Sequence, residues 1–214
     1  MKNSQENFDI ENNFYLSCDP SRIGKVIAQN ELYKKIINIP GEIIELGVFK
    51  GSSLSRFAIL RNIYEHNSSR KIIGFDTFGK FPETSHDDDK YFTKLHNDIS
   101  SSIKKTELIE SLKKRGIDEG IELIEGNIVK TVPNYVDEHP ELKISLLNLD
   151  TDVYEPAVTT LEKLFPRVCN GGVIIIDNYA KVPGETKAVD EFFQDNKILI
   201  NKFPYSSTPC FFIK

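Results

Sequence analysis

Two groups of polar residues stand directly after apolar runs in the second half of the chain. Asp150 and Asp152 follow the run ISLLNL, and Asp177 and Asn178 follow the run VIII. Carboxylate and amide oxygens are hard donors, which suit Mg²⁺ or another divalent cation. Asp150, Asp177 and Asn178 are therefore the candidate metal ligands, and no cluster of His and Cys indicates zinc. For any single one of these acids, the alternative is a helix cap or a solvated turn.

The first half of the chain carries a glycine turn with the spacing ExGxxxG, from Glu45 through Gly47 to Gly51. Glycines between a strand and a helix let the backbone bend tightly and approach a ligand, and the helix N-terminus favours an anionic group. The spacing differs from the GxGxxG of dinucleotide-binding proteins. The alternative is a plain glycine turn in which Ser52 caps the helix.

Two further polar positions follow apolar runs. Asp76 directly follows the run KIIGF and is placed to accept hydrogen bonds from two ribose hydroxyls. Asn127 follows Gly126 after the run IELIE, where an adenine ring could rest beside its amide. The alternatives are a solvated aspartate for Asp76 and an ordinary strand-ending turn at Asn127. Together these positions predict a nucleoside site.

The acids of the second half suit a reaction in which a hydroxyl oxygen acts as the nucleophile. An alcohol is a poor nucleophile until it is metal-bound or loses its proton to a placed base. Asp152 lies two residues beyond Asp150 and is the predicted base, so both are the candidate catalytic residues. Holding donor and acceptor in line supplies much of the remaining rate.

Alternating elements must bring these residues together. Strands alternating with helices predict an α/β fold with a doubly wound, mostly parallel sheet, and ligands bind such sheets at the carboxyl ends of the strands. The last two apolar runs, around the turn PYSS, predict a C-terminal antiparallel hairpin at the sheet edge. The expected strands are 42–46, 71–75, 121–125, 144–149, 173–176, 197–203 and 209–213, and the expected helices are 21–37, one from 52 on, 103–115, 129–138, 155–165 and 185–194.

The organisation along the chain is that of a single domain over 1–214, with an N-terminal helical segment at 1–40. The polar stretch 79–102 interrupts the alternation, and a stretch of this length is typical of a lid or a disordered loop. Phe81, Tyr91 and Phe92 are its candidate packing anchors. The charged run His86-Asp87-Asp88-Asp89 within it is better interpreted as a solvated loop than as a ligand site.

The composition of the chain argues against several classes of protein. A net charge of −5 provides no polycationic surface, so nucleic acid is not the expected partner. No apolar run approaches the roughly 20 residues that cross a bilayer, so no membrane association is expected. The three cysteines lack any metal-binding spacing and favour reduced thiols in the cytoplasm.

The chain resembles the macrocin O-methyltransferase family of bacterial sugar O-methyltransferases. The likeness lies in EIIELGVFKGSSL, IGFDTFGKFPE, LNLDTDVYEPAVTTLEKLFPRVCNGGVIIIDNY and PGETKAVDEFF. It implies a seven-stranded, Rossmann-like class I methyltransferase fold, S-adenosylmethionine as donor and magnesium as cofactor. The implied acceptor is a hydroxyl of a nucleotide sugar or glycosylated metabolite, and a homodimer would be unsurprising.

Carried over position by position, the resemblance places Glu45, Gly47, Ser53, Asp76 and Asn127 around the donor. It assigns Asp150, Asp177 and Asn178 to the metal and Asp152 to the general base. The chain departs from the family at Asn178, where relatives usually carry a second aspartate. The Asp-Asn pair is similar to the metal site of catechol-type O-methyltransferases, and it leaves the site with one negative charge fewer.

Three alternative functions stay open. Methylation of a catechol or another phenol is the nearest of them. A nicotinamide-dependent oxidoreductase is a second, although the absence of GxGxxG counts against it. A non-catalytic binding module on the same fold is the third, because fold alone never establishes function.

Overall fold

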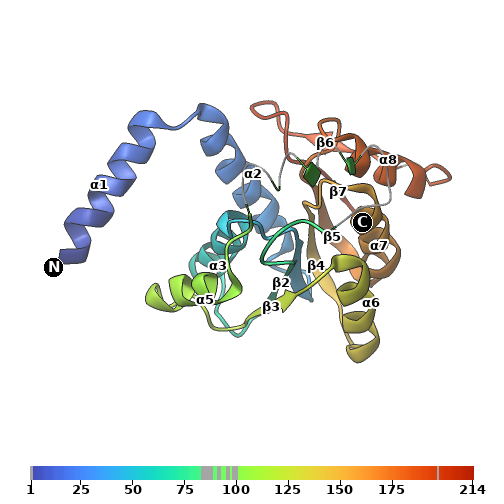
Figure 1. Cartoon of the computed structure of the whole chain (residues 1–214), viewed down its shortest axis with the longest axis horizontal. Helices are drawn as coiled ribbons and strands as arrows, with labels where there is room; N and C mark the ends of the chain where they lie inside the picture. Colours follow the sequence, from blue (N-terminus) through green and yellow to red (C-terminus); the bar gives the residue numbers. More distant parts are fainter. Residues whose placement is uncertain (1, 83–88, 91–92, 95–96, 98–100, 197) are drawn as a thin grey trace.

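A twisted sheet between two layers of helices forms the body of the protein (Figure 1). The computed structural model describes residues 2–82, 89–90, 93–94, 97, 101–196 and 198–214. Within these residues the sheet has seven strands in the order β3-β2-β1-β4-β5-β7-β6. The strands are β1 (Glu42–Leu46), β2 (Ile72–Asp76), β3 (Ile121–Glu125), β4 (Ile144–Leu149), β5 (Val168–Ile176), β6 (Asn201–Lys202) and β7 (Cys210–Ile213).

The first five strands are all parallel, and β7 is antiparallel to both β5 and β6. The order reverses at β1, which lies between β2 and β4, so the carboxyl ends of β1 and β4 form the topological switch point where such sheets bind ligands. The helices are α1 (Lys2–Ser17), α2 (Pro20–Ile36), α3 (Ser52–Tyr64), α5 (Lys105–Lys114), α6 (Ile128–Glu138), α7 (Tyr154–Leu164), the short 3₁₀ helix η1 (Phe165–Arg167) and α8 (Pro183–Phe192).

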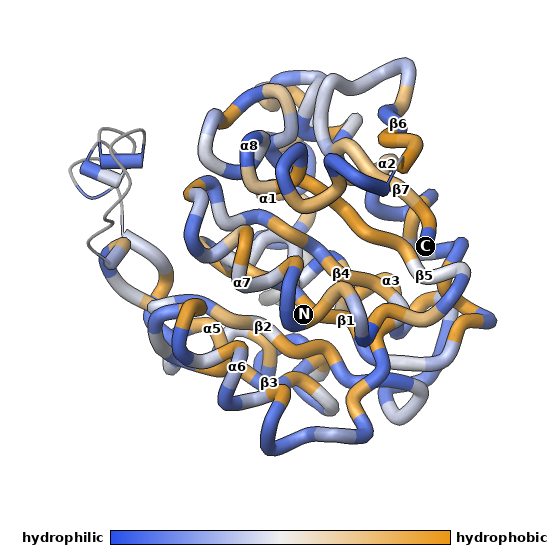
Figure 2. The backbone as a smooth tube through the Cα atoms, turned by 90° about the vertical axis from the view of Figure 1, so that its right-hand side faces the viewer, coloured by the Kyte–Doolittle hydropathy of each residue, from blue (hydrophilic) through white to orange (hydrophobic). Residues whose placement is uncertain are grey.

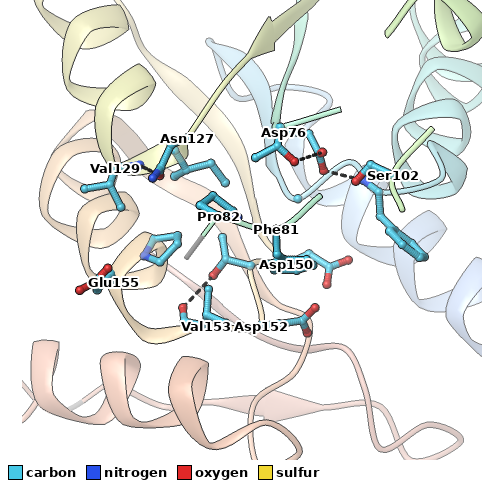
Figure 3. Close-up of a pocket in the computed structure, with 16 residues that line it drawn as sticks. Asp76, Phe81, Pro82, Ser102, Asn127, Val129, Asp150, Asp152, Val153 and Glu155 are labelled. Atoms are coloured by element: carbon cyan, nitrogen blue, oxygen red, sulfur yellow. Dashed lines mark hydrogen bonds between the residues drawn. The ribbon is translucent and has the colours of Figure 1, made fainter. Parts of the chain in front are cut away.

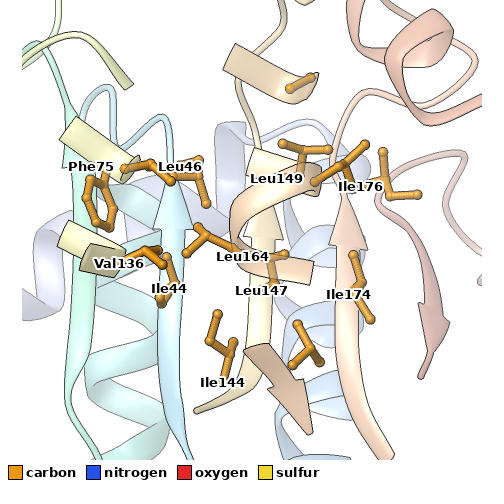
Figure 4. Close-up of a cluster of buried hydrophobic side chains, with 14 of the residues drawn as sticks. Ile44, Leu46, Phe75, Val136, Ile144, Leu147, Leu149, Leu164, Ile174 and Ile176 are labelled. Atoms are coloured by element: carbon orange, nitrogen blue, oxygen red, sulfur yellow. The ribbon is translucent and has the colours of Figure 1, made fainter. Parts of the chain in front are cut away.

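Both faces of the sheet are buried, because successive residues of a strand point to opposite sides. On β1, Ile44 packs in a cluster with residues of α6, α7 and α8, as Figure 4 shows for Val136 and Leu164. Its neighbour Ile43 packs on the other face with residues of α2, α3 and α5. This double burial explains why the central strands are continuous hydrophobic runs, which Figure 2 shows in orange.

The strand boundaries differ from expectation at four places, one of them β7, which begins at Cys210 and not at Pro209. β2 begins and ends one residue later than predicted, so Asp76 is its last residue. β5 begins at Val168 and not at Val173, because a register shift against β4 lets the chain extend through Gly171 and Gly172, which look like a turn in the sequence. β6 contains only two residues, so the hairpin is shorter than the apolar pattern suggests.

Helix α1 extends away from the body of the protein (Figure 1). Five large apolar side chains along it are exposed: Phe8, Ile10, Phe14, Tyr15 and Leu16. Helix α2 follows, and its buried residues Leu32, Tyr33 and Ile36 pack on the sheet. In the part of the chain that the structure describes, no helix has both the length and the hydropathy to cross a membrane.

Candidate active site

A cavity of about 130 Å³ lies at the carboxyl ends of β1, β2 and β4 (Figure 3). Five of the nine predicted site residues line it. These are Gly47, Asp76, Asn127, Asp150 and Asp152. The sheet therefore brings the predicted nucleoside residues and the predicted catalytic acids to one cavity, although they are far apart in the sequence.

The glycine turn after β1 is held tightly against the loop after β4. Gly47 has a φ of +89°, and a Cβ atom at this position would lie only 1.9 Å from the backbone oxygen of Asp150. A side chain is therefore excluded here by both backbone conformation and space. The glycine makes possible the close approach of the two strand ends beside the cavity.

Asp76 connects the turns that follow β1 and β2. One oxygen of its carboxylate accepts a hydrogen bond from the backbone N–H of Phe49 at 2.8 Å, and the other accepts from the N–H of Phe78 at 2.7 Å. The side chain is largely buried and lines the cavity. Its carboxylate is thus fixed in orientation before any ligand binds.

Asn127 lines the cavity and is also the N-cap of α6. Its side-chain oxygen accepts a hydrogen bond from the backbone N–H of Val129 at 3.0 Å. This contact stabilises the helix start and orients the amide at the cavity wall.

Glu45 and Ser53 do not line the cavity. They contact each other inside the protein, where the Ser53 hydroxyl donates to Oε1 of Glu45. Oε2 of Glu45 has no hydrogen-bond partner among the described residues. Burial raises the pKa of Glu45 to about 8, and the hydrogen bond from Ser53 offsets part of this effect.

Hydrogen bonds from the Asn178 side chain connect the two predicted catalytic acids. Its Nδ2 atom donates to Oδ1 of Asp150 at 3.0 Å and to Oδ1 of Asp152 at 2.7 Å. Burial, then the charge of Asp177, raises the pKa of Asp150 above its usual range. The same two causes raise the pKa of Asp152 to about 7. These residues form the acid centre, defined as Asp150, Asp152, Asp177 and Asn178.

The sequence interpretation missed Glu185 of α8, which contacts the two loops that carry the acid centre. Its fully buried carboxylate accepts from the backbone N–H groups of Thr151 and Asp152, both at 3.1 Å, and from that of Asn178 at 2.8 Å. It thereby fastens the loop after β4 to the loop after β5. Its position in the first turn of a helix is common for an acid, so no sequence signal distinguished it.

Lys25 of α2 is a second missed residue. Its Nζ lies 2.6 Å from Oδ2 of Asp177, while Oδ1 of Asp177 is buried without a hydrogen-bond partner among the described residues. Burial by itself lowers the pKa of Lys25, but the charges of Asp177 and Asp150 outweigh it and raise the pKa overall. On the predicted helix Lys25 was one polar residue among several, and only tertiary structure brings it to the acid centre.

The acid centre has suitable donors for a divalent cation but is not arranged around one. Among the described residues, no three His, Cys, Asp or Glu side chains are placed to hold a metal ion together. The unpartnered Oδ1 of Asp177 and the mutual effect of the Asp150, Asp152 and Asp177 charges nevertheless show that negative charge is concentrated at the acid centre. In the chemistry of its donors, Asp150, Asp177 and Asn178 fit Mg²⁺.

Part of the predicted lid closes one side of the cavity. Phe81, Pro82 and Ser102 are lining residues. Asp89 is buried, and its carboxylate accepts from the backbone N–H of Tyr154 at 2.7 Å, at the start of α7. The other residues named in this segment, which are His86, Asp87, Asp88, Tyr91 and Phe92, lie outside the described residues.

A model of the macrocin-O-methyltransferase (TylF) family matches residues 26–207. The chain is 28% identical over 148 residues to the 8-demethyl-8-(2,3-dimethoxy-alpha-L-rhamnosyl)-tetracenomycin-C 4'-O-methyltransferase of Streptomyces olivaceus, covering 66% of this chain and 54% of that protein. It is 27% identical over 162 residues to the demethyldecarbamoylnovobiocin O-methyltransferase of Streptomyces niveus, covering 72% and 59%. The matched regions thus span a little over half the length of these curated relatives.

Solved structures share the fold. The apo structure of CalS11, a TDP-rhamnose 3'-O-methyltransferase, has a TM-score of 0.72 and 28% identity, covering 96% of this chain and 85% of that chain. The O-methyltransferase NovP has a TM-score of 0.75 and 21% identity, covering 89% and 79%. These similarities confirm the class I methyltransferase fold expected from the sequence.

Proposed function

Since the chain belongs to the macrocin-O-methyltransferase (TylF) family, we propose that it transfers a methyl group from S-adenosylmethionine to a hydroxyl of a sugar-containing small molecule. The observation that carries this proposal is the cavity itself. It runs from Asp76 and Asn127, suited to a nucleoside, to Asp150 and Asp152, suited to an acceptor hydroxyl.

In this proposal the donor lies over the glycine turn. The fixed carboxylate of Asp76 accepts hydrogen bonds from the two ribose hydroxyls, and Asn127 lies beside the adenine. Gly47 leaves the backbone uncovered, which lets the methionyl part of the donor approach the end of β1. Glu45 and Ser53 act from below by holding the turn in shape.

Asp152 takes the proton from the acceptor hydroxyl as the oxygen attacks the methyl carbon. The carbon–sulfur bond breaks as the carbon–oxygen bond forms, and S-adenosylhomocysteine leaves with the electron pair on sulfur. A pKa of about 7 suits this role, because a general base works best when its pKa lies near the working pH. The hydrogen bond from Asn178 orients the Asp152 carboxylate.

Asp150, Asp177 and Asn178 would hold the magnesium ion. When bound, such an ion acidifies and positions a coordinated hydroxyl. The buried, unpartnered oxygen of Asp177 supports this assignment, together with the oxygen-rich donor set.

A glycosylated metabolite or a nucleotide sugar is the acceptor class that we propose. The matched relatives are named for rhamnosyl-tetracenomycin and novobiocin intermediates, and CalS11 is named for TDP-rhamnose. The homodimer suggested by the sequence resemblance stays a prediction.

Calorimetric titration with S-adenosylhomocysteine tests the donor part of the proposal. We expect the wild type to bind and Asp76→Asn to bind about ten- to a hundredfold more weakly, because hydrogen bonds to a charged group are lost. Asp195→Asn, which changes an exposed aspartate outside the cavity, should bind like the wild type. No binding by the folded wild type would contradict the proposed function.

Incubation with S-adenosylmethionine and a panel of nucleotide sugars, glycosides and catechols then tests the acceptor. Mass spectrometry should detect a gain of one methyl group on a sugar hydroxyl. Methylation of catechols alone would replace the proposed acceptor class with phenols.

A further inference from the structure

Helix α2 places a cation at the acid centre. The Nζ atom of Lys25 contacts Oδ2 of Asp177 at 2.6 Å, and its side chain is 21% exposed while that of Asp177 is 7% exposed. Because both partners are largely removed from water, their interaction is screened less than a surface ion pair. Lys25 is therefore a component of the centre and not a solvated residue of the helix surface.

The negative charges around Lys25 attract its ammonium group to the acid centre. The carboxylates of Asp150, Asp152 and Asp177 lie together at the ends of β4 and β5, and Glu185 is buried directly below them. The positive charge of the Arg56 guanidinium on α3 also attracts the charges of the buried Glu45, Asp177 and Asp150. The Nε of Arg56 donates a hydrogen bond to Gln29. Lys25 is the residue that forms a direct ion pair with the acid centre in the part of the chain that the structure describes.

We propose that Lys25 is a built-in counter-ion of the acid centre and competes with a divalent cation for Asp177. This inference rests on the proposed metal site at Asp150, Asp177 and Asn178. An ammonium group at Oδ2 of Asp177 repels a second cation bound at the same carboxylate, and the repulsion is strong where water is excluded. Metal binding must therefore displace the Lys25 ammonium group or overcome its charge.

Asn178 strengthens this competition. An amide contributes no negative charge, so the centre attracts a metal less strongly than one with a second aspartate at this position. The same amide already donates to Asp150 and Asp152, so one oxygen of each carboxylate has a hydrogen-bond partner without any metal. Lys25 and Asn178 together make the net charge of the acid centre less negative, so a divalent cation is attracted to it less strongly.

Titration of the whole chain 1–214 with Mn²⁺, a spectroscopic probe for a magnesium site, tests the competition. Calorimetry and electron paramagnetic resonance measure the Mn²⁺ affinity directly and do not depend on turnover. Lys25→Met keeps the apolar stem and removes the charge. We expect it to bind Mn²⁺ at least about tenfold more tightly than the wild type.

Two matched variants accompany this measurement. Lys34→Met makes the same change on the same helix, at an exposed lysine paired with Glu31, and should leave the Mn²⁺ affinity unchanged. Lys25→Arg retains a positive charge and should stay within a few-fold of the wild type. Thermal unfolding confirms that each variant is folded, and Lys25→Gln provides a second neutral variant if Lys25→Met is not.

The Mn²⁺ affinity of Lys25→Met supports or overturns the competition between Lys25 and the metal. An equal or weaker Mn²⁺ affinity in Lys25→Met overturns the competition while leaving the metal site in place, and a weaker one would make Lys25 a residue that organises the site. No Mn²⁺ binding by any variant overturns both the competition and the metal part of the proposed function. S-adenosylhomocysteine binding, measured on the same samples, shows separately whether the donor site is intact.

Discussion

At the scale of single residues, the site consists of acids that are partly or fully buried. Asp150, Asp152 and Glu45 all have raised pKa values, and burial is the largest cause in each case. Only one of them, Asp152, combines a pKa of about 7 with a place on the cavity wall. This combination distinguishes the proposed base from the acids that support it.

Asp152→Asn should therefore lose turnover without losing the donor. We expect kcat to fall about a hundredfold or more, because the amide cannot accept the hydroxyl proton. The affinity for S-adenosylhomocysteine should change little. Steady-state kinetics and calorimetry on the same preparation measure both, with Asp137→Asn on the exposed side of α6 as the control. Unchanged kcat in Asp152→Asn would assign the base elsewhere.

Glu45 gives the stability of the protein a dependence on pH. Its pKa is raised from 4.5 to about 8 in the folded state, so between these values the folded protein holds a proton that the unfolded chain has released. The free energy of unfolding must then fall as pH rises through this window. Glu45→Gln cannot ionise and should show a smaller fall.

Urea denaturation of both proteins at several pH values from about 5 to about 8 measures this difference. The ligand-free proteins are compared, so that donor binding does not contribute. Identical pH slopes in the two proteins would mean that Glu45 is ionised in the folded state.

At the scale of elements, helix α8 holds two loops of the site together. Glu185 projects from its first turn and accepts three backbone hydrogen bonds from the loops after β4 and β5. The same carboxylate thus contacts the backbone of both Asp152 and Asn178. The geometry of the acid centre therefore depends on a helix that contributes nothing to the cavity wall.

Glu185→Ala should destabilise the protein by about 3 kcal/mol, because buried N–H groups lose their acceptor. Chemical denaturation measures this loss. Glu191→Ala, on the exposed side of the same helix, serves for comparison and should cost much less. Glu185→Gln keeps an acceptor oxygen and should recover part of the stability. An equal cost at both positions would show that the loops are held by other contacts.

At the scale of the whole molecule, the sheet and its two helical layers form one body, and α1 lies outside it (Figure 1). The two hydrophobic clusters include residues from α2 onward and none of the side chains described for α1. Stability and donor binding should therefore reside in the part of the chain that begins with α2.

A variant without residues 1–17 tests this division. We expect its Tm and its affinity for S-adenosylhomocysteine to match those of the full chain, because no core contact is removed. Scanning calorimetry and titration check the two quantities. A fall in Tm of several degrees would show that α1 packs on the body or on a second copy of the chain.

The sequence by itself determined the fold and several polar residues of the cavity wall. Apolar runs separated by helical patterns specified the parallel sheet, because strands buried on both faces need continuous hydrophobic residues. Asp76, Asn127, Asp150 and Asp152 were found because polar residues at the carboxyl ends of such strands share one edge of the sheet. Their side chains meet there through geometry that the alternation of elements already fixes.

Only tertiary structure decided what surrounds those residues. Lys25 and Glu185 lie on helices whose polar positions look alike in the sequence, and packing alone selects which of them reach the acid centre. Glu45 is adjacent to the glycine turn in sequence, but the pleat of β1 directs it away from the cavity wall. Contacts between elements far apart in the chain carry no local pattern, so only the folded structure reveals them.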